Sequence, residues 1–161
     1  MLEEKIKQYL GEHGFGRFCP KAVLFDMDGV LYDSMPHHAV AWRQSMAQFG
    51  IKMTAEDAYA TEGARGIDTI RHFVKTQKGQ EISFEEAQKM YNVKTHIFHN
   101  MPEAPVFDGV IEVMEQAFRH GMSVNVVTGS GQKPLIERLI RDFGDYLSKD
   151  HIVTAYDVER G

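Results

Sequence analysis

The sequence predicts an α/β protein in which a parallel, doubly wound sheet carries an inserted all-helical domain. Short apolar runs at 22–25, 123–127 and 151–154 have the length of buried strands, and helical patterns separate the later ones. Strands that alternate with helices are typical of a parallel sheet. No segment between residues 35 and 100 has the pattern of a strand, so a block of helices is inserted into the first crossover.

The chain begins with a predicted amphipathic helix over 2–10, because apolar and charged side chains recur there with helical spacing. We expect this helix to pack on the sheet; a role at a membrane surface or a partner is the alternative. The first strand, 22–25, follows. It ends in Asp26, and Asp28 and Gly29 come directly after.

The inserted block is predicted to contain four helices. Ser34 and Pro36 begin the first helix, and Gly50 ends it. Capping patterns at 54–57 and 83–86 begin the second and the fourth. Apolar residues at 67, 70 and 74 give the third helix its buried stripe. Two prolines, Pro102 and Pro105, mark the linker that leads out of the block.

The second half of the chain predicts two strands with a helix before each. Asp108 is expected to cap a helix over 110–118 that Gly121 ends. The strand 123–127 then runs into a glycine-rich turn at 128–131. A helix with apolar residues between 135 and 143 leads to the third strand, 151–154.

Composition limits the classes of function. The 161 residues are 43% hydrophobic and 25% charged, with a net charge of −5, which is ordinary for a globular protein and gives no nucleic-acid footprint. No apolar run approaches a membrane span, and the first residues lack the apolar centre of a signal peptide. The single cysteine, Cys19, has no internal disulfide partner. We therefore expect a cytoplasmic protein without nucleic-acid or membrane partners; no pattern indicates its oligomeric state.

Asp26 and Asp28 stand at the carboxyl end of the first strand, where open α/β sheets bind ligands. Two carboxylates leaving a strand there can face different ways, one toward a substrate atom and the other toward its leaving group. They repel each other unless a cation lies between them, which implies a hard divalent ion such as Mg²⁺. The alternative is an ordinary turn before Gly29.

The turn Thr128-Gly129-Ser130-Gly131 is the second candidate, at the end of the second strand. A hydroxyl and exposed backbone N–H groups at a strand-to-helix turn suit a phosphate oxygen. A plain glycine-rich turn is the alternative. Because the carboxyl ends of parallel strands meet at one edge, this turn and the aspartates are expected to face one crevice.

The string DMDGVLYDS at 26–34 closely resembles the first motif of the haloacid dehalogenase-like superfamily, and the turn at Thr128 resembles its second motif. Most members are Mg²⁺-dependent phosphatases and phosphomutases with a Rossmann-like sheet. The resemblance implies a core over 1–33 and 104–161 and a mobile helical cap over 34–103. The cap would be hinged at 32–35 and 101–107 and would select the substrate.

The resemblance also implies a role for each matching residue. Asp26 would attack phosphorus and form an aspartyl-phosphate, and Asp28 would protonate the leaving group and then activate water or an acceptor hydroxyl. Mg²⁺ would be held by Asp26 and the backbone carbonyl of Asp28. Thr128, with Gly129 and Ser130, would bind the phosphate. Relatives that displace halide usually lack the second aspartate, so Asp28 points to phosphoester chemistry.

Three cap residues are candidates for substrate contacts. The order of residues 33–42 resembles the β-phosphoglucomutase branch and places His38 and Trp42 near the site; a surface histidine and a core tryptophan are the alternatives. Arg65 could reach a distal phosphate, or it is a solvated loop arginine. In the mutase branch a Lys-Gly pair precedes this arginine. Here Glu62 replaces the lysine and Arg65 comes one place early, which favours a phosphatase.

We therefore expect Mg²⁺-dependent hydrolysis of a small phosphorylated metabolite, such as a sugar phosphate, through an aspartyl-phosphate. A β-phosphoglucomutase-like isomerase is the alternative, and an inactive fragment or non-catalytic protein of this fold is the alternative of another class. The family's lysine after the third strand and its acidic metal-binding pair have no counterparts in the 161 residues. This pattern predicts the front two-thirds of an enzyme, C-terminally truncated, that turns over poorly alone.

Overall fold

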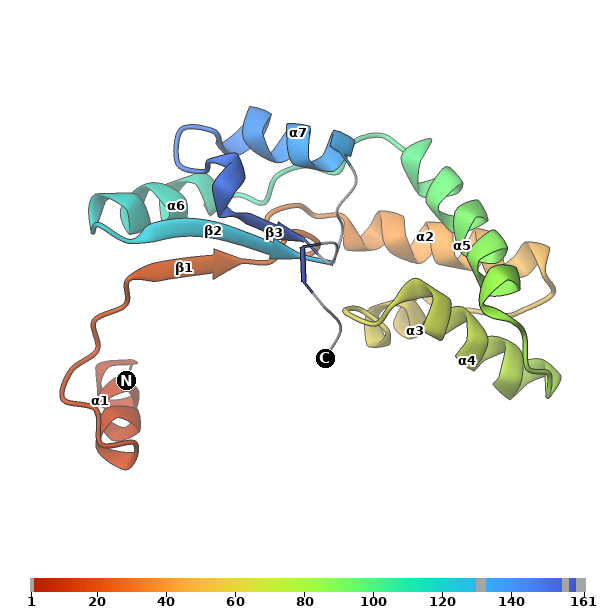
Figure 1. Cartoon of the computed structure of the whole chain (residues 1–161), viewed down its shortest axis with the longest axis horizontal. Coiled ribbons are helices and arrows are strands. Elements are labelled where there is room, and N and C mark those ends of the chain that lie inside the picture. Colours follow the sequence, from red (N-terminus) through yellow and green to blue (C-terminus); the bar gives the residue numbers. More distant parts are fainter. Residues whose placement is uncertain (1, 130–132, 155–156, 159–161) are drawn as a thin grey trace.

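The computed structural model describes residues 2–129, 133–154 and 157–158. Figure 1 shows a small sheet beside a block of helices. The strands are β1 (Ala22–Phe25), β2 (Ser123–Thr128) and β3 (Ile152–Thr154). They are parallel and lie in the order β1-β2-β3. β2 is one residue longer than predicted, and β3 starts one residue later because Lys149–His151 form the short 3-10 helix η1.

Two helices cover one face of this sheet. α6 (Val110–Arg119) leads into β2, and α7 (Lys133–Phe143) connects β2 to β3 on the same side (Figure 1). Side chains along a strand alternate between faces, so Val124 and Val126 are buried beneath the helices while Val127 is 41% exposed. The parallel sheet with helical crossovers confirms the predicted α/β class. No described helix has the length and apolar content needed to cross a membrane.

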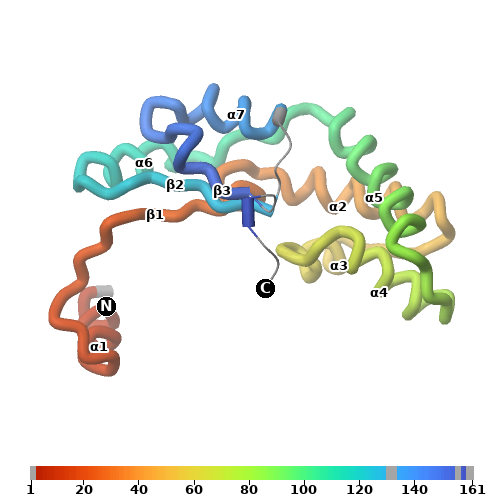
Figure 2. The backbone as a smooth tube through the Cα atoms, in the orientation of Figure 1, coloured from red at the N-terminus to blue at the C-terminus, as the bar shows by residue number. Residues whose placement is uncertain are grey.

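Helix α1 (Leu2–Glu12) forms as predicted, but the prediction that it packs on the sheet is wrong. Figures 1 and 2 show it set apart from the sheet, at the far end of an extended segment. Residues 11–21 are all exposed. The ring of Tyr9 stacks instead on His13, with centroids 4.2 Å apart, and lies 6.2 Å from Phe15. Of the apolar side chains of α1, Tyr9 therefore makes only local ring contacts and stays 53% exposed.

The inserted block contains the four predicted helices: α2 (Met35–Gln48), α3 (Ala55–Ala60), α4 (Gly66–Lys78) and α5 (Phe84–His99). Both predicted capping boxes are present. In the first, the N–H of Asp57 donates to Oγ1 of Thr54 at 3.1 Å; in the second, that of Glu86 donates to Oγ of Ser83 at 3.2 Å. α2 packs against α3 and α5, and α5 packs against α4.

The sheet side and the helical block each have a hydrophobic cluster of their own. The first lies between the sheet and the α6–α7 layer and includes Leu31, Met114, Val126, Leu139 and Phe143. The second lies among the block's helices and includes Trp42, Met46, Ile70, Val74 and Met90. The separation of the two clusters supports the proposed division into a core over 1–33 and 104–161 and a cap over 34–103.

The start of α6 differs from prediction. Gly109, not Asp108, occupies the position before the helix, and no side chain caps it. Gly109 has φ +84°, a left-handed conformation that glycine adopts without the steric cost of a side chain. The prediction of Asp108 as the cap is therefore wrong.

Candidate active site

The first two strands bring the predicted motifs to one edge of the sheet. Phe25 of β1 lies opposite Val126 of β2, so Asp26 and Thr128 leave neighbouring strands at the same end. Asp26 is exposed, and its Oδ1 accepts a 2.7 Å hydrogen bond from the N–H of Met27. Thr128 is buried and Gly129 is exposed. Ser130, the third residue predicted to bind phosphate, lies outside the described residues.

Asp28 sits in a tight turn after β1. The N–H groups of Leu31 and Tyr32 donate to the carbonyl of Met27 at 3.0 and 3.1 Å, and the N–H of Gly29 donates to the carbonyl of Tyr32 at 2.9 Å. The turn needs φ +75° at Gly29, which explains the glycine after the second aspartate. The Asp28 side chain is 12% exposed, and its Oδ1 accepts a 2.6 Å hydrogen bond from Oγ of Ser34.

Two basic side chains of the helical block reach this carboxylate. Nε2 of His38, on α2, lies 3.4 Å from Oδ1 of Asp28, and Nζ of Lys94, on α5, lies 2.8 Å from Nδ1 of His38. Burial by itself raises the pKa of Asp28. The contact with His38, the hydrogen bond from Ser34 and the charge of Lys94 outweigh burial, so the pKa of Asp28 is lowered.

The Lys94 contact fixes the proton on the imidazole. A charged ammonium has only donors, so Nδ1 of His38 must accept and the ring proton resides on Nε2. That N–H faces Asp28 at 3.4 Å, and Nε2 is buried without a hydrogen bond among the described residues.

Lys94 is a candidate site residue that the sequence analysis missed. It is 4% exposed, and its Nζ lies 5.0 Å from the ring centroid of Phe98, 5.2 Å from that of Trp42 and 5.9 Å from that of Tyr91. Burial lowers the pKa of Lys94 to about 8, partly offset by the charges of Asp28 and Glu62. Its position within the apolar stripe of α5 was the one feature of the sequence that could have indicated a buried lysine.

A cavity of about 220 Å³ adjoins this group. It lies where the turn after β1 meets α2, α5, the linker 101–104 and the start of α7, and its lining includes Asp28, His38, Lys94, His99 and Arg138. Its lining combines apolar side chains with a few charged ones, as small-molecule sites do. It places Asp28 at the junction of the two parts of the molecule.

Two predicted cap residues do not line this cavity. Trp42 is 7% exposed and belongs to the cap cluster, where its ring contacts Lys94 and Tyr91. Arg65 is exposed just before α4 and pairs with Asp68 at 2.5 Å. Of the three cap candidates, the structure brings only His38 to Asp28.

The oxygen atoms available at the end of β1 are of the types that bind Mg²⁺. Carboxylate and carbonyl oxygens are the ligands that Mg²⁺ prefers, and Asp26 presents an exposed carboxylate one residue from the turn that holds Asp28. Within the described part of the chain, no three His, Cys, Asp or Glu side chains gather as a metal site. Asp26 and the Asp28 carbonyl would therefore be two ligands among several.

Comparison with known proteins finds a matching family and similar solved structures. The sequence model of the haloacid dehalogenase-like hydrolases matches residues 20–161. A solved structure of a proposed β-phosphoglucomutase from Bacteroides vulgatus is 40% identical, with a TM-score of 0.88; the match covers 98% of this chain and 64% of that one.

Curated relatives are more distant in sequence. Validoxylamine A 7'-phosphate phosphatase from Streptomyces hygroscopicus subsp. limoneus is 26% identical over 141 residues, covering 88% of this chain and 64% of that protein. Hexitol phosphatase A from Escherichia coli is also 26% identical over 141 residues, covering 88% and 62%. The chain thus spans less than two thirds of the length of each of these proteins.

Proposed function

The chain belongs to the haloacid dehalogenase-like hydrolase family, and from this membership we propose that the protein hydrolyses a small phosphorylated metabolite, such as a sugar phosphate. Both curated phosphatases act on phosphorylated small molecules according to their names. A reducing cytoplasm is the proposed location, in keeping with a free, exposed Cys19.

One observation carries the proposal: Asp28 bonds to Ser34 at 2.6 Å and faces a histidine–lysine pair of the helical block. A carboxylate in a partly buried turn, with a lowered pKa and donors from a second part of the molecule, has the environment of a group that moves protons. A turn-forming aspartate needs none of these contacts.

Asp26 and Asp28 are proposed to have different roles in the reaction. Asp26 is exposed at the strand end, with one oxygen fixed by the N–H of Met27, so its other oxygen is the proposed nucleophile that forms an aspartyl-phosphate. The attack breaks the phosphorus–oxygen bond to the leaving group, and Asp28 gives the departing oxygen a proton. Asp28, now ionised, then accepts a proton from the water that hydrolyses this intermediate. The lowered pKa of Asp28 suits it to that second step, since the group is ionised at neutral pH.

Mg²⁺, when bound, would neutralise the charge of the phosphoryl group. We propose that Asp26 and the backbone carbonyl of Asp28 hold the ion. Thr128 and Gly129 at the adjacent strand end are the proposed phosphate-binding residues, with Ser130 beside them. Because this turn and Asp26 leave neighbouring parallel strands, a phosphate held by one lies near the other.

The helical block is proposed to select the substrate. His38 and Lys94 belong to the block, and Asp28 belongs to the sheet side, so the proton-handling group is complete only when the two parts meet. Trp42 would act by supporting Lys94. Arg65, exposed before α4, is proposed to reach a distal group of the substrate when the block closes.

A β-phosphoglucomutase-like isomerase is the second candidate. The observation that favours it is the 40% identity to a proposed β-phosphoglucomutase across 98% of this chain. A mutase uses the same aspartyl-phosphate but returns the phosphoryl group to the sugar. Glu62, in place of the lysine expected for that branch, favours the phosphatase.

Product analysis tests the proposal and separates the two candidates. The protein is incubated with Mg²⁺ and a panel of hexose and hexitol phosphates, and inorganic phosphate and sugar-phosphate isomers are both quantified. Release of phosphate that Asp26→Asn eliminates supports the phosphatase. An isomeric sugar phosphate without phosphate release supports the mutase. Turnover that is unchanged in Asp26→Asn contradicts both.

A further inference from the structure

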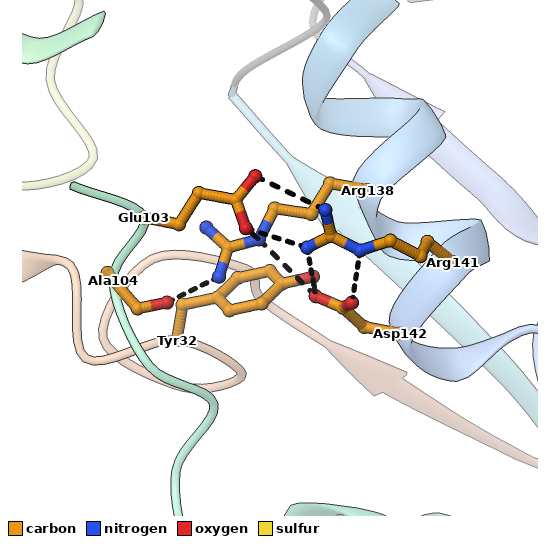
Figure 3. Close-up of polar contacts among 6 residues, drawn as sticks. All are labelled: Tyr32, Glu103, Ala104, Arg138, Arg141 and Asp142. Carbon is orange, nitrogen blue, oxygen red and sulfur yellow. Dashed lines mark hydrogen bonds and ion pairs between the residues drawn. The ribbon is translucent and has the colours of Figure 1, made fainter. Parts of the chain in front are cut away.

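A second polar cluster borders the cavity on the side where the chain enters and leaves the helical block. Figure 3 shows its members: Tyr32, Glu103, Ala104, Arg138, Arg141 and Asp142. Arg138 is at its centre and is only 13% exposed. Its guanidinium carbon lies 3.9 Å from the ring centroid of Tyr32, and its Nη2 donates to the carbonyl of Ala104.

The guanidinium of Arg138 therefore touches both segments that join the sheet to the block. Tyr32 belongs to the entering segment and Ala104 to the returning one. These segments also pair with each other: the N–H of Asp33 donates to the carbonyl of Pro105 at 2.9 Å, and that of Phe107 donates to Leu31 at 3.1 Å. One side chain of α7 thus fastens both ends of the inserted block.

Asp142 completes the arrangement one turn further along α7. It accepts hydrogen bonds from the hydroxyl of Tyr32 at 3.0 Å and from Nε of Arg138 at 3.3 Å. Burial raises the pKa of Asp142, but the hydrogen bonds from Arg141 and Tyr32 and the charges of Arg141 and Arg138 outweigh it, so its pKa is lowered. Asp142 therefore stays ionised at neutral pH and keeps both partners.

Tyr32 connects this cluster to the proton-handling site. Its carbonyl accepts from the N–H of Gly29, and its own N–H donates to Met27, so its backbone closes the turn that holds Asp28. A displacement of Tyr32 displaces Asp28. A displacement of Ala104 and the linker changes the angle of the block, and with it the 3.4 Å separation between Asp28 and His38.

We propose that Arg138, Asp142 and Tyr32 form a clamp through which α7 sets the angle of the helical block on the sheet, and so positions His38 and Lys94 against Asp28. The clamp rests on the proposed function, because its purpose is to position that site. Its members are positioning residues: their bonds run to the two linkers and to the turn, and their effect reaches Asp28 through Tyr32. α7 also follows directly after the proposed phosphate-binding turn, so the same helix borders both.

The angle of the block is measurable without catalysis. The sequence contains one tryptophan, Trp42, inside the block, and one cysteine, Cys19, which is free, exposed and three residues before β1. Labelling Cys19 with a dansyl-type acceptor allows energy transfer from Trp42 to report the distance between block and sheet. Circular dichroism confirms that each variant retains its helices.

Arg138→Met and Tyr32→Phe are expected to lower the efficiency of energy transfer or to broaden the distribution of distances between Trp42 and the label. The first change removes the guanidinium that contacts Tyr32 and Ala104. The second removes only the hydrogen bond from Tyr32 to Asp142. Arg119→Met is the matched control, since Arg119 is 66% exposed on α6 and pairs with Glu115 of its own helix. Unchanged transfer in Arg138→Met, or an equal change in Arg119→Met, would overturn the clamp.

A kinetic measurement then connects the clamp to the site. We expect Arg138→Met to lower kcat/KM roughly tenfold, the size expected for one misplaced positioning contact of about 1.4 kcal/mol. Because the Asp28 charge supports the ionised form of Lys94, a larger gap between them should move the alkaline limb of the pH profile to lower pH. A lower rate without this movement contradicts positioning of Lys94. If no substrate is turned over, the proposed function fails while the transfer measurement still decides the clamp.

Discussion

Nζ of Lys94 lies 2.8 Å from Nδ1 of His38, although 56 positions separate the two residues in the sequence. The pair brings a buried cation to the carboxylate of Asp28 from across the junction of block and sheet. A charged Lys94 fixes the tautomer of His38, and the tautomer aims an N–H at Asp28. While Lys94 is protonated, the ring proton of a neutral His38 therefore lies on Nε2, the nitrogen nearest to Asp28.

The pH dependence of Lys94 gives the first prediction. Its pKa is lowered to about 8, so it is protonated below that pH and loses its charge above it. We expect kcat/KM to fall as the pH rises through about 8, and this limb to disappear in Lys94→Arg, which stays charged. Lys89→Arg, an exposed change on the same helix, should leave the profile as it is. An alkaline limb retained in Lys94→Arg would assign the titration to another group.

The proposed nucleophile gives the second prediction. Asp26→Asn should abolish the phosphoenzyme and reduce turnover at least a thousandfold, because the amide is a far weaker nucleophile than the carboxylate. Asp28→Asn should slow turnover roughly a hundredfold or more, because both the formation and the hydrolysis of the phosphoenzyme lose their acid or base, but the phosphoenzyme should still be detectable. Intact-mass measurement after a brief reaction detects the added phosphoryl group. Asp150→Asn, an exposed change far along the chain, is the control; phosphoenzyme in Asp26→Asn would exclude this role.

The Ser34 hydrogen bond gives a prediction on stability. The pKa of Asp28 is lowered in the fold, so its contacts stabilise the protein above about pH 4, the ordinary value of the group, and this stabilisation is lost as the pH falls through the lower folded value. Ser34→Ala should reduce the free energy of unfolding at pH 7 by about 1.5 kcal/mol, typical for a hydrogen bond to a charged group.

Denaturant titration from pH 7 to pH 3 measures this difference. We expect the gap between Ser34→Ala and the unsubstituted protein to shrink below about pH 4, where Asp28 becomes protonated. Ser148→Ala is the control, because Ser148 is exposed and makes no side-chain capping bond. A gap that stays constant with pH would show that Ser34 does not act through the Asp28 charge.

Removal of divalent ions gives the fourth prediction. Treatment with a chelator should reduce phosphatase activity to background, and added Mg²⁺ should restore it, since two carboxylates at the strand end need a hard cation. The far-ultraviolet circular dichroism should stay unchanged, because both hydrophobic clusters are built from side chains alone. Activity that persists after chelation would contradict the proposed Mg²⁺ role.

Much of the fold could be predicted because its signals are local. The strand lengths, the capping boxes at Thr54 and Ser83 and the helical block follow from patterns within a few residues of each other. The position of α1 was predicted wrongly, since apolar spacing indicates a face that can be buried, and no described side chain of α1 is buried. Asp108 failed as a cap because Gly109 takes the position before α6 with a positive φ.

The site was predictable only in part, for a related reason. Asp26 and Thr128 are strand-end features, and the strand register places them at the same edge of the sheet. That the turn and the aspartates face one crevice stays a prediction. The order of residues 33–42 favoured His38 as a site residue, and the structure places it 3.4 Å from Asp28. Lys94 and Arg138 carry no motif. Each acts through contacts with segments distant in sequence, and only the fold reveals them.

Backbone hydrogen bonds between Asp33 and Pro105 and between Leu31 and Phe107 hold the two ends of the inserted block together. The block therefore joins the sheet at a single place. Since both ends of the insertion leave the sheet side at one paired junction, its contents can lengthen, shorten or be exchanged without altering the strand ladder beneath. The proposed choice of substrate could therefore vary separately from the residues proposed to transfer the phosphoryl group. The same junction marks where a protein engineer would cut to graft a different block onto this sheet.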